Sequence, residues 1–456
     1  EAAARALAAG VDVEMASSTY SSLPEAVKAG AIPVATIDSA VRRVLMTKDA
    51  LGLFDDPYRG VDSATERAAM LTLANRAAAR RLAGEAIVLL KNDGVLPLRK
   101  NLGSIAVIGP LADDSASVLG SWSAAGRSED AVTVLAGIRA AVAGTGTRVT
   151  HTRGVPMDSI DLRGVPAAER LARSAGAVLL VLGESRNMSG EASSRATLDL
   201  PGAQLELARR VIRAARRTRP GKPVAVVLMN GRPLAVPWLA DSAPAILESW
   251  FLGVEHGHAV ADVVFGDANP SGRLPVSVPR AVGQIPVNYA RRPTGRPPDS
   301  TGHYTSGYID LDWKPLWPFG HGLSYTTFGY GALRVLADTV RTSDSVAVEI
   351  DVTNTGPRRG DETVQLYLRD DVASVAQPVR RLVRFDRIGL DSGETRTVRF
   401  VLRPDDLALY DLTLRRVVEP GAFTLYAGGS STASDSTRFT VLGDTLVLAA
   451  SPPRFR

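Results

Sequence analysis

A run of six aliphatic residues, Ala177 to Leu182, opens directly into a polar segment, residues 183–195. A strand without polar alternation must be buried on both faces, which is typical of parallel sheets covered by helices. In open sheets of this kind, ligands bind beyond the carboxyl ends of the strands. The polar segment contains two carboxylates, Glu184 and Glu191, and two arginines. The run therefore predicts a buried strand, and the segment after it is a candidate site.

Residues 87–286 repeat this alternation of aliphatic runs and helical segments. Further short aliphatic runs lie at 87–91, 104–109, 224–229 and 245–250, and helical patterns such as 202–217 and 260–264 separate several of them. Strands that alternate with helices indicate a mostly parallel sheet with helices on both faces. We therefore predict an α/β sandwich domain over residues 87–286.

The composition changes after Pro286. Residues 287–342 are rich in Pro, Gly, Tyr and Trp, which suits a packed connector. Residues 343–445 then place apolar side chains at every second position between turn residues, as in Val346-x-Val348-x-Ile350-x-Val352. This period is typical of an antiparallel β-sandwich. Residues 446–456 are predicted to be a tail.

The first 60 residues predict one βα unit. A short strand-like stretch at 10–15 precedes two helices, and Asp38 is placed to cap the second helix. A single strand with its helices cannot bury its own faces, so residues 1–60 need a sheet or barrel that these residues do not supply. Residues 61–86 are predicted to be a helical linker.

Composition excludes several classes of protein. Hydrophobic residues make up 45% and charged residues 22% of the 456 residues, and no apolar run is long enough to span a bilayer. The formal net charge of +5 comes from scattered arginines, without the basic stripe that nucleic-acid binding needs. The chain has no cysteine, and His256 and His258 lack further ligands at usable spacing. We therefore expect no metal and no cofactor.

Three motifs carry a resemblance to a known family. They are residues 183–195 with Leu200-Pro201-Gly202-Ala203-Gln204 behind them, Gly10-Val11-Asp12-Val13-Glu14-Met15, and Leu51-Gly52-Leu53-Phe54-Asp55-Asp56-Pro57. In these motifs the chain resembles family 3 glycoside hydrolases, and among them the periplasmic β-glucosidases. The resemblance implies an N-terminal (β/α)8 barrel, of which residues 1–60 match the last βα unit, then the α/β sandwich and a fibronectin type III-like β-sandwich. Most of the barrel is absent from this sequence.

Retaining glycoside hydrolases use two carboxyl groups about 5 to 5.5 Å apart, one attacking the sugar and the other moving a proton. The resemblance assigns the proton-moving role, that of the general acid/base, to Glu191. Spacing alone favours an exposed loop glutamate there, and the resemblance reverses that interpretation. Glu184 is expected to be a structural partner. The nucleophile of the family is an aspartate in a Ser-Asp-Trp motif that does not occur here, and Asp12 belongs to a different motif.

The resemblance also implies residues that contact the sugar. Trp122 follows the run at 104–109 and is either a stacking platform for a sugar or a core or interface tryptophan. Arg195 either holds the loop or contacts sugar hydroxyls. The other expected substrate-binding residues are Met188, Glu14, Met15, Tyr20 and Ser306.

Together these features predict the C-terminal part of a retaining exo-acting β-glucosidase, which acts on terminal non-reducing β-D-glucosyl residues and is inactive as this chain alone. A β-xyloside is the alternative substrate. A non-catalytic remnant or an accessory subunit that binds sugars or a protein is the alternative function. The expected partners are the glycoside, a barrel segment or N-terminal chain and, as an option, a second copy in a homodimer, but no nucleic acid and no membrane. The resemblance alone implies a periplasmic or secreted bacterial protein.

Overall fold

The computed structural model describes residues 1–60, 62–299 and 302–449 and divides into two units. The N-terminal unit is Glu1–Asn75, and the main unit begins at Arg76. Residues 450–456 of the predicted tail, residues 300–301 of the predicted connector and residue 61 of the predicted linker lie outside the described residues. Each unit is treated by itself below.

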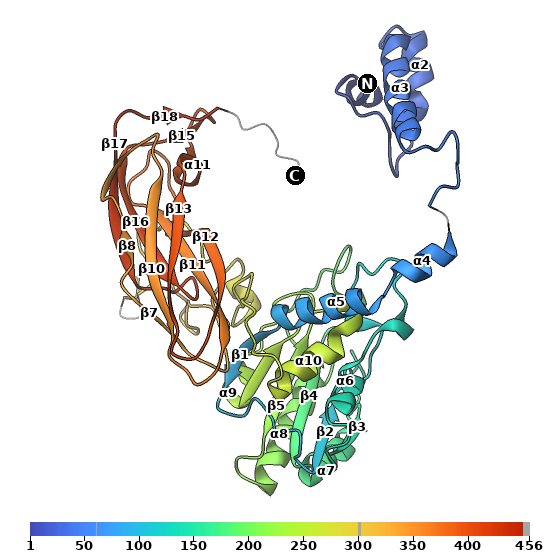
Figure 1. Cartoon of the computed structure of the whole chain (residues 1–456), viewed down its shortest axis with the longest axis vertical. Helices are drawn as coiled ribbons and strands as arrows, with labels where there is room; N and C mark the ends of the chain where they lie inside the picture. The colour runs from blue at the N-terminus through green and yellow to red at the C-terminus, as the bar shows by residue number, and fades with distance from the viewer. Residues whose placement is uncertain (61, 300–301, 450–456) are drawn as a thin grey trace. The chain divides into compact units, whose positions relative to one another are not determined.

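The N-terminal unit is helical (blue in Figure 1). Its elements are α1 Ala2–Ala8, the 3-10 helix η1 Thr19–Ser22, α2 Leu23–Lys28, α3 Val34–Ala50 and α4 Ser63–Ala69. The two predicted helices correspond to α2 and α3, but α3 begins after Pro33, so Asp38 lies inside the helix and the predicted cap is wrong. Residues 11–15 form no strand, because no second strand is there to hydrogen-bond with them.

A six-stranded sheet forms the centre of the main unit. Its strands are β1 Val88–Asn92, β2 Ser104–Ile108, β3 Arg148–Thr152, β4 Ala177–Gly183, β5 Val224–Met229 and β6 Ala245–Glu248, in the order β1-β6-β5-β4-β2-β3. Only β1 runs antiparallel to its neighbour, so the sheet is mostly parallel, as predicted. The sequence prediction missed β3, an edge strand whose polar side chains are exposed or half-buried.

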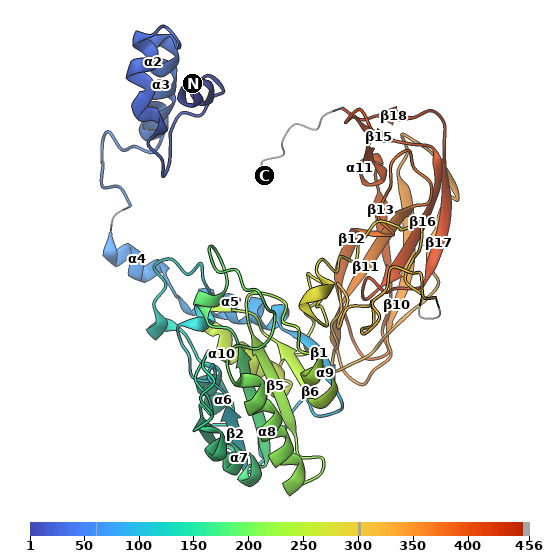
Figure 2. The same cartoon turned by 180° about the vertical axis from the view of Figure 1, so that it is seen from behind.

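Helices cover both faces of this sheet. On one face lie α5 Leu73–Ala86, α6 Val134–Ala141 and α10 His256–Phe265, and on the other α7 Val165–Ser174, α8 Gln204–Thr218 and α9 Pro237–Ser242 (Figures 1 and 2). All seven residues of β4 are buried, as expected of a strand between two helical layers. The sheet therefore has two hydrophobic cores, one under each helical layer.

The order of the strands fixes where loops can form a crevice. From β2 the chain passes through α6 to β3 on one side, and from β3 through α7 to β4 on the other side of β2. The strand order therefore reverses between β2 and β4, which makes this a topological switch point. Ligands of open α/β sheets bind beyond the carboxyl ends of the strands at such a point. The loops that follow β2 and β4 flank it.

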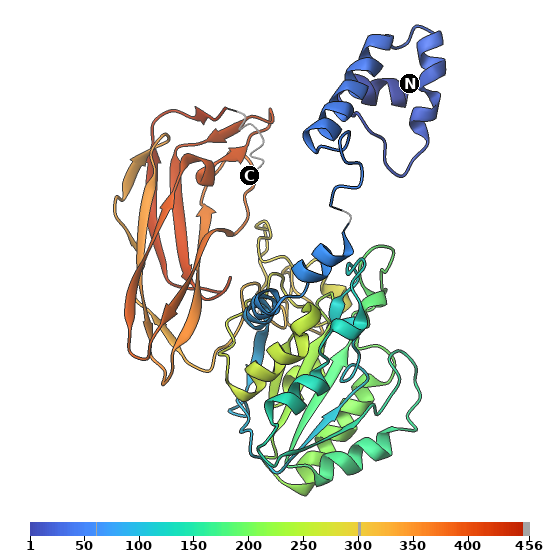
Figure 3. The same cartoon turned by 45° about the vertical axis from the view of Figure 1, so that its right-hand side comes forward.

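From β7 onward the main unit is a mostly antiparallel β-sandwich (orange to red in Figure 3), in which β9 alone pairs in parallel, with β17. One sheet is formed by β7 Phe328–Tyr330, β8 Arg334–Val335, β10 Val346–Asn354 and β13 Thr395–Leu402, and the other by β9 Thr339–Arg341, β11 Gly360–Asp370, β12 Arg381–Leu390, β16 Gly421–Gly428 and β17 Ser436–Leu442. A small third sheet contains β14 Leu409–Tyr410, β15 Arg416–Val418 and β18 Leu446–Val447, beside α11 Pro404–Leu407. Every second residue of β10 is buried, the period that the sequence shows. Strands β7, β8 and β9 come from the segment predicted as connector.

Candidate active site

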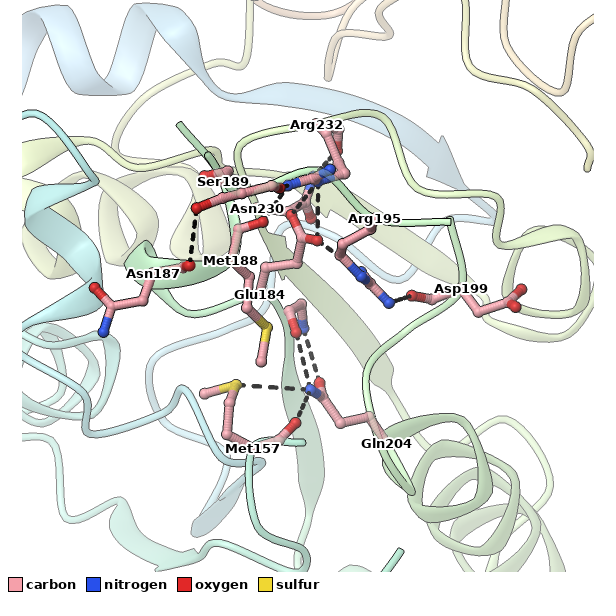
Figure 4. Close-up of polar contacts among 12 residues, drawn as sticks. Met157, Glu184, Asn187, Met188, Ser189, Arg195, Asp199, Gln204, Asn230 and Arg232 are labelled. Carbon is pink, nitrogen blue, oxygen red and sulfur yellow. Dashed lines mark hydrogen bonds and ion pairs between the residues drawn. The ribbon is translucent and has the colours of Figure 1, made fainter. Parts of the chain in front are cut away.

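A buried carboxylate anchors the loop that follows β4. Glu184 is 0% exposed, and its carboxylate contacts Nη1 of Arg195 at 2.6 Å and Nε of Arg232 at 3.1 Å. A carboxylate with no access to water is stable only when it is paired and hydrogen-bonded. Figure 4 shows both guanidinium groups converging on it. Glu184 is therefore a structural partner, as expected, and Arg195 holds the loop.

Arg232 extends this anchor to the backbone on both sides of Glu191. Its Nη2 group donates to the carbonyl oxygen of Met188 and, at 2.7 Å, to that of Ser193. Arg195 donates to the carbonyl oxygen of Asp199 at 2.9 Å. These charge-assisted bonds tie residues 188–199 to the sheet at several points. The loop is a fixed support for the residue at its tip.

Gln204 sets the direction in which the chain leaves β4. Its buried side-chain amide accepts from the Gly183 nitrogen and donates to the Gly183 oxygen, both at 2.9 Å (Figure 4). Gly183 has φ +137°, and a β-carbon there would lie 2.0 Å from the carbonyl oxygen of Met229. Only glycine fits this approach of β4 to β5. The family-like motif at 200–204 therefore supports the loop and does not itself react.

The loop after β2 meets the loop after β4. The Ser121 hydroxyl lies 2.6 Å from the carbonyl oxygens of both Arg186 and Ser189. A β-carbon on Gly190 would lie 3.7 Å from Nε1 of Trp122. The switch point thus brings Trp122 next to the segment that carries Glu191. Trp122 is 75% exposed, so it is not a core residue, and its ring is free to stack on a ligand.

Glu191 occupies the exposed tip of the loop. No hydrogen bond or ion pair of its side chain joins it to the part of the chain that the structure describes. The next residue, Ala192, has φ +56°, a conformation that costs a non-glycine residue on the order of 1 kcal/mol or more. Strained backbone of this kind gathers at functional sites. Glu191 is thus a carboxylate presented outward by a braced and strained turn.

A second buried carboxylate, Glu248 at the end of β6, lies behind the anchor. Asn230 donates to Glu248 Oε2 at 3.1 Å and to the Arg232 carbonyl oxygen at 2.8 Å. Burial raises the pKa of Glu248 to about 8, and the charge of Glu184 adds to that effect. Glu248 therefore keeps its proton at neutral pH, and Arg195 and Arg232 are left to balance Glu184 alone.

The remaining predicted site residues occupy several places. Met188 is half-buried within the loop, and its carbonyl oxygen binds Arg232. The Ser306 hydroxyl donates to the Arg296 carbonyl oxygen at 2.7 Å and lies 3.1 Å from the Thr294 hydroxyl. It stays a prediction as a sugar contact.

Three predicted residues belong to the N-terminal unit. The carboxylate of Glu14 accepts from the backbone nitrogens of Thr19 and Tyr20 at 2.6 and 2.8 Å. The Tyr20 hydroxyl donates to the Val11 carbonyl oxygen, and Met15 is exposed. Asp12 accepts hydrogen bonds from Arg43 through both carboxylate oxygens.

The sequence analysis missed Arg232 and Ser121 as supports of the site. Arg232 follows β5, which pairs with β4 in parallel. Its position after a predicted strand could therefore have indicated that it lies at the same edge of the sheet as the loop after β4. Ser121 carried no such signal beyond lying next to Trp122. The side chain of His256 is buried and accepts a hydrogen bond from the Leu252 nitrogen, and His258 pairs with Glu255. In the described ranges no three His, Cys, Asp or Glu side chains are grouped to hold a metal ion.

Comparison with known proteins agrees with this architecture. The glycosyl hydrolase family 3 C-terminal domain matches residues 87–325, and a fibronectin type III-like domain matches residues 362–431. The chain is 42% identical to a periplasmic β-glucosidase of Salmonella typhimurium, over 96% of this chain and 60% of that protein. It is 41% identical to a β-xylosidase of Formosa agariphila, over 95% of this chain and 60% of that protein.

Solved structures give the same result. A mutant β-glucosidase from Listeria innocua, crystallised in complex with laminaribiose, superposes with a TM-score of 0.90 at 37% identity, over 98% of this chain and 60% of that one. The fold is that of a glycoside hydrolase module, an α/β sandwich joined to a β-sandwich. The chain belongs to glycosyl hydrolase family 3. It spans about 60% of the length of these relatives.

Proposed function

We propose that this chain is the C-terminal part of a retaining exo-acting β-glucosidase, in which Glu191 is the general acid/base. The nucleophile would be an aspartate of a (β/α)8 barrel segment, in which residues 1–60 would become the last βα unit once a neighbouring strand pairs with residues 11–15. One observation carries the proposal: Glu191 is presented outward at the switch point, beside Trp122, on a loop braced by Glu184, Arg195 and Arg232.

In this mechanism Glu191 works twice. It first gives its proton to the glycosidic oxygen while the nucleophile attacks the anomeric carbon, and a covalent glycosyl-enzyme forms. It then takes a proton from the water that hydrolyses this intermediate. Proton transfer needs a carboxylate held within about 0.5 Å of its working position, and the bonds of Arg232 to the Met188 and Ser193 carbonyl oxygens supply that rigidity.

The substrate proposed is a terminal non-reducing β-D-glucosyl residue. A relative named periplasmic β-glucosidase and a solved β-glucosidase in complex with laminaribiose support it. The 41% identity to a β-xylosidase supports a β-xyloside as the second candidate. We also propose a periplasmic or secreted location, from the name of the Salmonella relative. In the part of the chain that the structure describes, no helix has the length and apolarity to cross a membrane.

The test joins this chain to a family 3 barrel segment that bears a Ser-Asp-Trp motif and measures hydrolysis of aryl β-glucosides. Loss of the acid/base slows deglycosylation most when the leaving group is good, so Glu191→Ala should lower kcat by roughly 100-fold or more. Added azide should restore turnover, because it attacks the glycosyl-enzyme without needing a base and releases β-glucosyl azide. The control is Glu206→Ala on the outer face of α8, which should keep full activity.

Activity that persists in Glu191→Ala, with no dependence on azide, would refute this assignment. Turnover by this chain without any barrel segment would refute the placement of the nucleophile. If the joined protein binds glucosides but hydrolyses none of them, whatever their leaving group, the alternative function holds. The chain is then an accessory sugar-binding module and not part of an enzyme.

A further inference from the structure

The segment that follows β6 makes a sharp turn beside the loops of the candidate active site. Trp250, two residues after β6, has φ +55°. A bulky residue rarely adopts this left-handed conformation, so its surroundings must hold it there. The Trp250 nitrogen donates to Glu248 Oε1 at 3.1 Å, and the Leu252 nitrogen donates to Nδ1 of His256 at 3.2 Å. Phe251 is therefore held between two fixed neighbours.

The side chain of Phe251 packs against two glycines, which belong to different loops. A β-carbon on Gly120, in the loop after β2, would lie 3.2 Å from the β-carbon of Phe251. A β-carbon on Gly231, in the loop after β5, would lie 3.1 Å from Cε2 of the Phe251 ring and 2.3 Å from the Ser189 hydroxyl oxygen. Phe251 thus contacts both loops at points where a larger residue would press on it.

The two glycines directly precede the two residues that brace the loop after β4. Gly120 precedes Ser121, whose hydroxyl contacts two carbonyl oxygens of that loop at 2.6 Å. Gly231 precedes Arg232, which donates to two further carbonyl oxygens of the same loop. A displacement at either glycine therefore moves a brace, and Phe251 contacts both glycines.

These contacts distinguish Phe251 from an ordinary core residue. It is half-buried and packs against the core under α6 and α10. A core aromatic stabilises the fold wherever it lies, but a side chain that touches two loops also fixes their spacing, because close-packed contacts transmit displacements. The spacing of the loops after β2 and β5 therefore depends on the ring of Phe251.

We propose that Phe251 is a positioning residue for the acid/base. It sets the spacing of the loops after β2 and β5 and, through Ser121 and Arg232, the place of Glu191. This inference rests on the proposed function of Glu191. Phe251 takes no part in the proton transfer itself, but a misplacement of about 1 Å can cost on the order of 100-fold in rate.

The test uses the protein joined to a barrel segment and an aryl β-glucoside with a good leaving group. Phe251→Ala should lower kcat about tenfold, because a displaced Glu191 is a poor base for deglycosylation. The glycosyl-enzyme then accumulates, so KM should fall together with kcat, and added azide should restore turnover. A mere loss of folded protein would lower kcat and kcat/KM in proportion, without a response to azide.

Phe265→Ala is the matched control. It removes the same ring from the same core, at the C-terminal end of α10, and should lower the melting temperature without changing KM or the response to azide. Gly231→Ala approaches the contact from the other side. Its methyl group would overlap Ser189 and press on Phe251, so it should give the kinetic signature of Phe251→Ala without opening the core. If Phe251→Ala does not fold, Gly231→Ala and Phe251→Leu carry the test.

Deuterium uptake by residues 184–195, measured on the whole chain without a barrel segment, is independent of catalysis. Phe251→Ala should raise the uptake at short exposure times, and Phe265→Ala should leave it at the level of the parent. Equal uptake in these two variants would overturn the proposal, as would a loss of kcat in Phe251→Ala without a fall in KM or a response to azide. If Glu191→Ala stays active while Phe251→Ala raises the uptake, the acid/base assignment fails, but the positioning of the loop by Phe251 stands.

Discussion

At the scale of single residues, two buried glutamates support the candidate site, and they differ in their partners. Glu184 is balanced by Arg195 and Arg232, whereas among the residues that the structure describes Glu248 has the amide of Asn230 and the Trp250 nitrogen as its hydrogen-bond partners. A carboxyl group without a cation retains its proton when it is buried. The protonated state of Glu248 therefore leaves a single negative charge for two guanidinium groups to hold.

This difference predicts a pH dependence of stability. In the unfolded chain Glu248 ionises near its ordinary pKa of 4.5, but in the folded chain its pKa is about 8. Between these values the folded chain binds more protons than the unfolded chain, so the free energy of unfolding falls as the pH rises from about 5 to 8, by up to about 1.4 kcal/mol per pH unit. The loss levels off about one pH unit above 8, where Glu248 is ionised in the folded chain as well.

Glu248→Gln should abolish this contribution. Thermal unfolding at pH 5, 6.5 and 8 tests this prediction. The melting temperature of the parent should fall steadily, relative to that of the variant, as the pH rises. Glu206→Gln, on the exposed face of α8, serves as the control and should track the parent throughout. A constant difference between parent and Glu248→Gln at all three pH values would show that Glu248 is ionised in the folded chain.

At the scale of elements, two helices that cover one face of the sheet meet through glycines. A β-carbon on Gly137 of α6 would lie 2.0 Å from the carbonyl oxygen of Gly257 in α10. Glycine is a poor helix former, so its presence in α6 is explained by this close approach and not by local preference. The loop after β2 leads into α6, and its end at Val132 is hydrogen-bonded to Val254 and Gly257, so its position depends on how α6 and α10 pack.

Two Gly→Ala substitutions separate these effects. Gly84→Ala in α5 meets nothing within 4 Å, so it should raise the free energy of unfolding by roughly 0.5 to 1 kcal/mol. Gly137→Ala gains the same helix propensity but overlaps the α10 backbone, so it should lower stability by roughly 1 to 3 kcal/mol. Urea unfolding of both variants tests the pair. Stabilisation by both substitutions would contradict the close packing of α6 and α10.

At the scale of the whole molecule, the two units differ in the size of their hydrophobic cores. The main unit has three large cores. The N-terminal unit has a small one of Leu7, Ile32 and Ala40, and α3 leaves Val34, Val41, Leu45 and Met46 between 44% and 63% exposed. An apolar stripe of this kind normally packs against another element, here proposed to be the rest of the barrel.

Removal of residues 1–70 should therefore leave the main unit folded. The thermal transition of the shortened chain, measured by calorimetry, is expected at the temperature of the parent's main transition, because the cores of the main unit are kept and α5 stays whole. Light scattering should show less self-association, since the exposed face of α3 is gone. Loss of the transition would show that the main unit depends on the N-terminal residues.

The sequence by itself determined much of this protein. The aliphatic run at 177–182 predicts β4, the period-two pattern after residue 343 predicts the sandwich, and the motif around Glu191 identifies the family, because hydrophobic periodicity and motif spacing are local properties of the chain. Contacts across the sheet are not local. Arg232 reaches Glu184 because β5 pairs with β4, and Ser121 and Trp122 reach the same loop because the strand order reverses between β2 and β4. The sequence therefore predicted Glu191 as the acid/base candidate, and only the tertiary structure decided what holds its loop and what lies beside it.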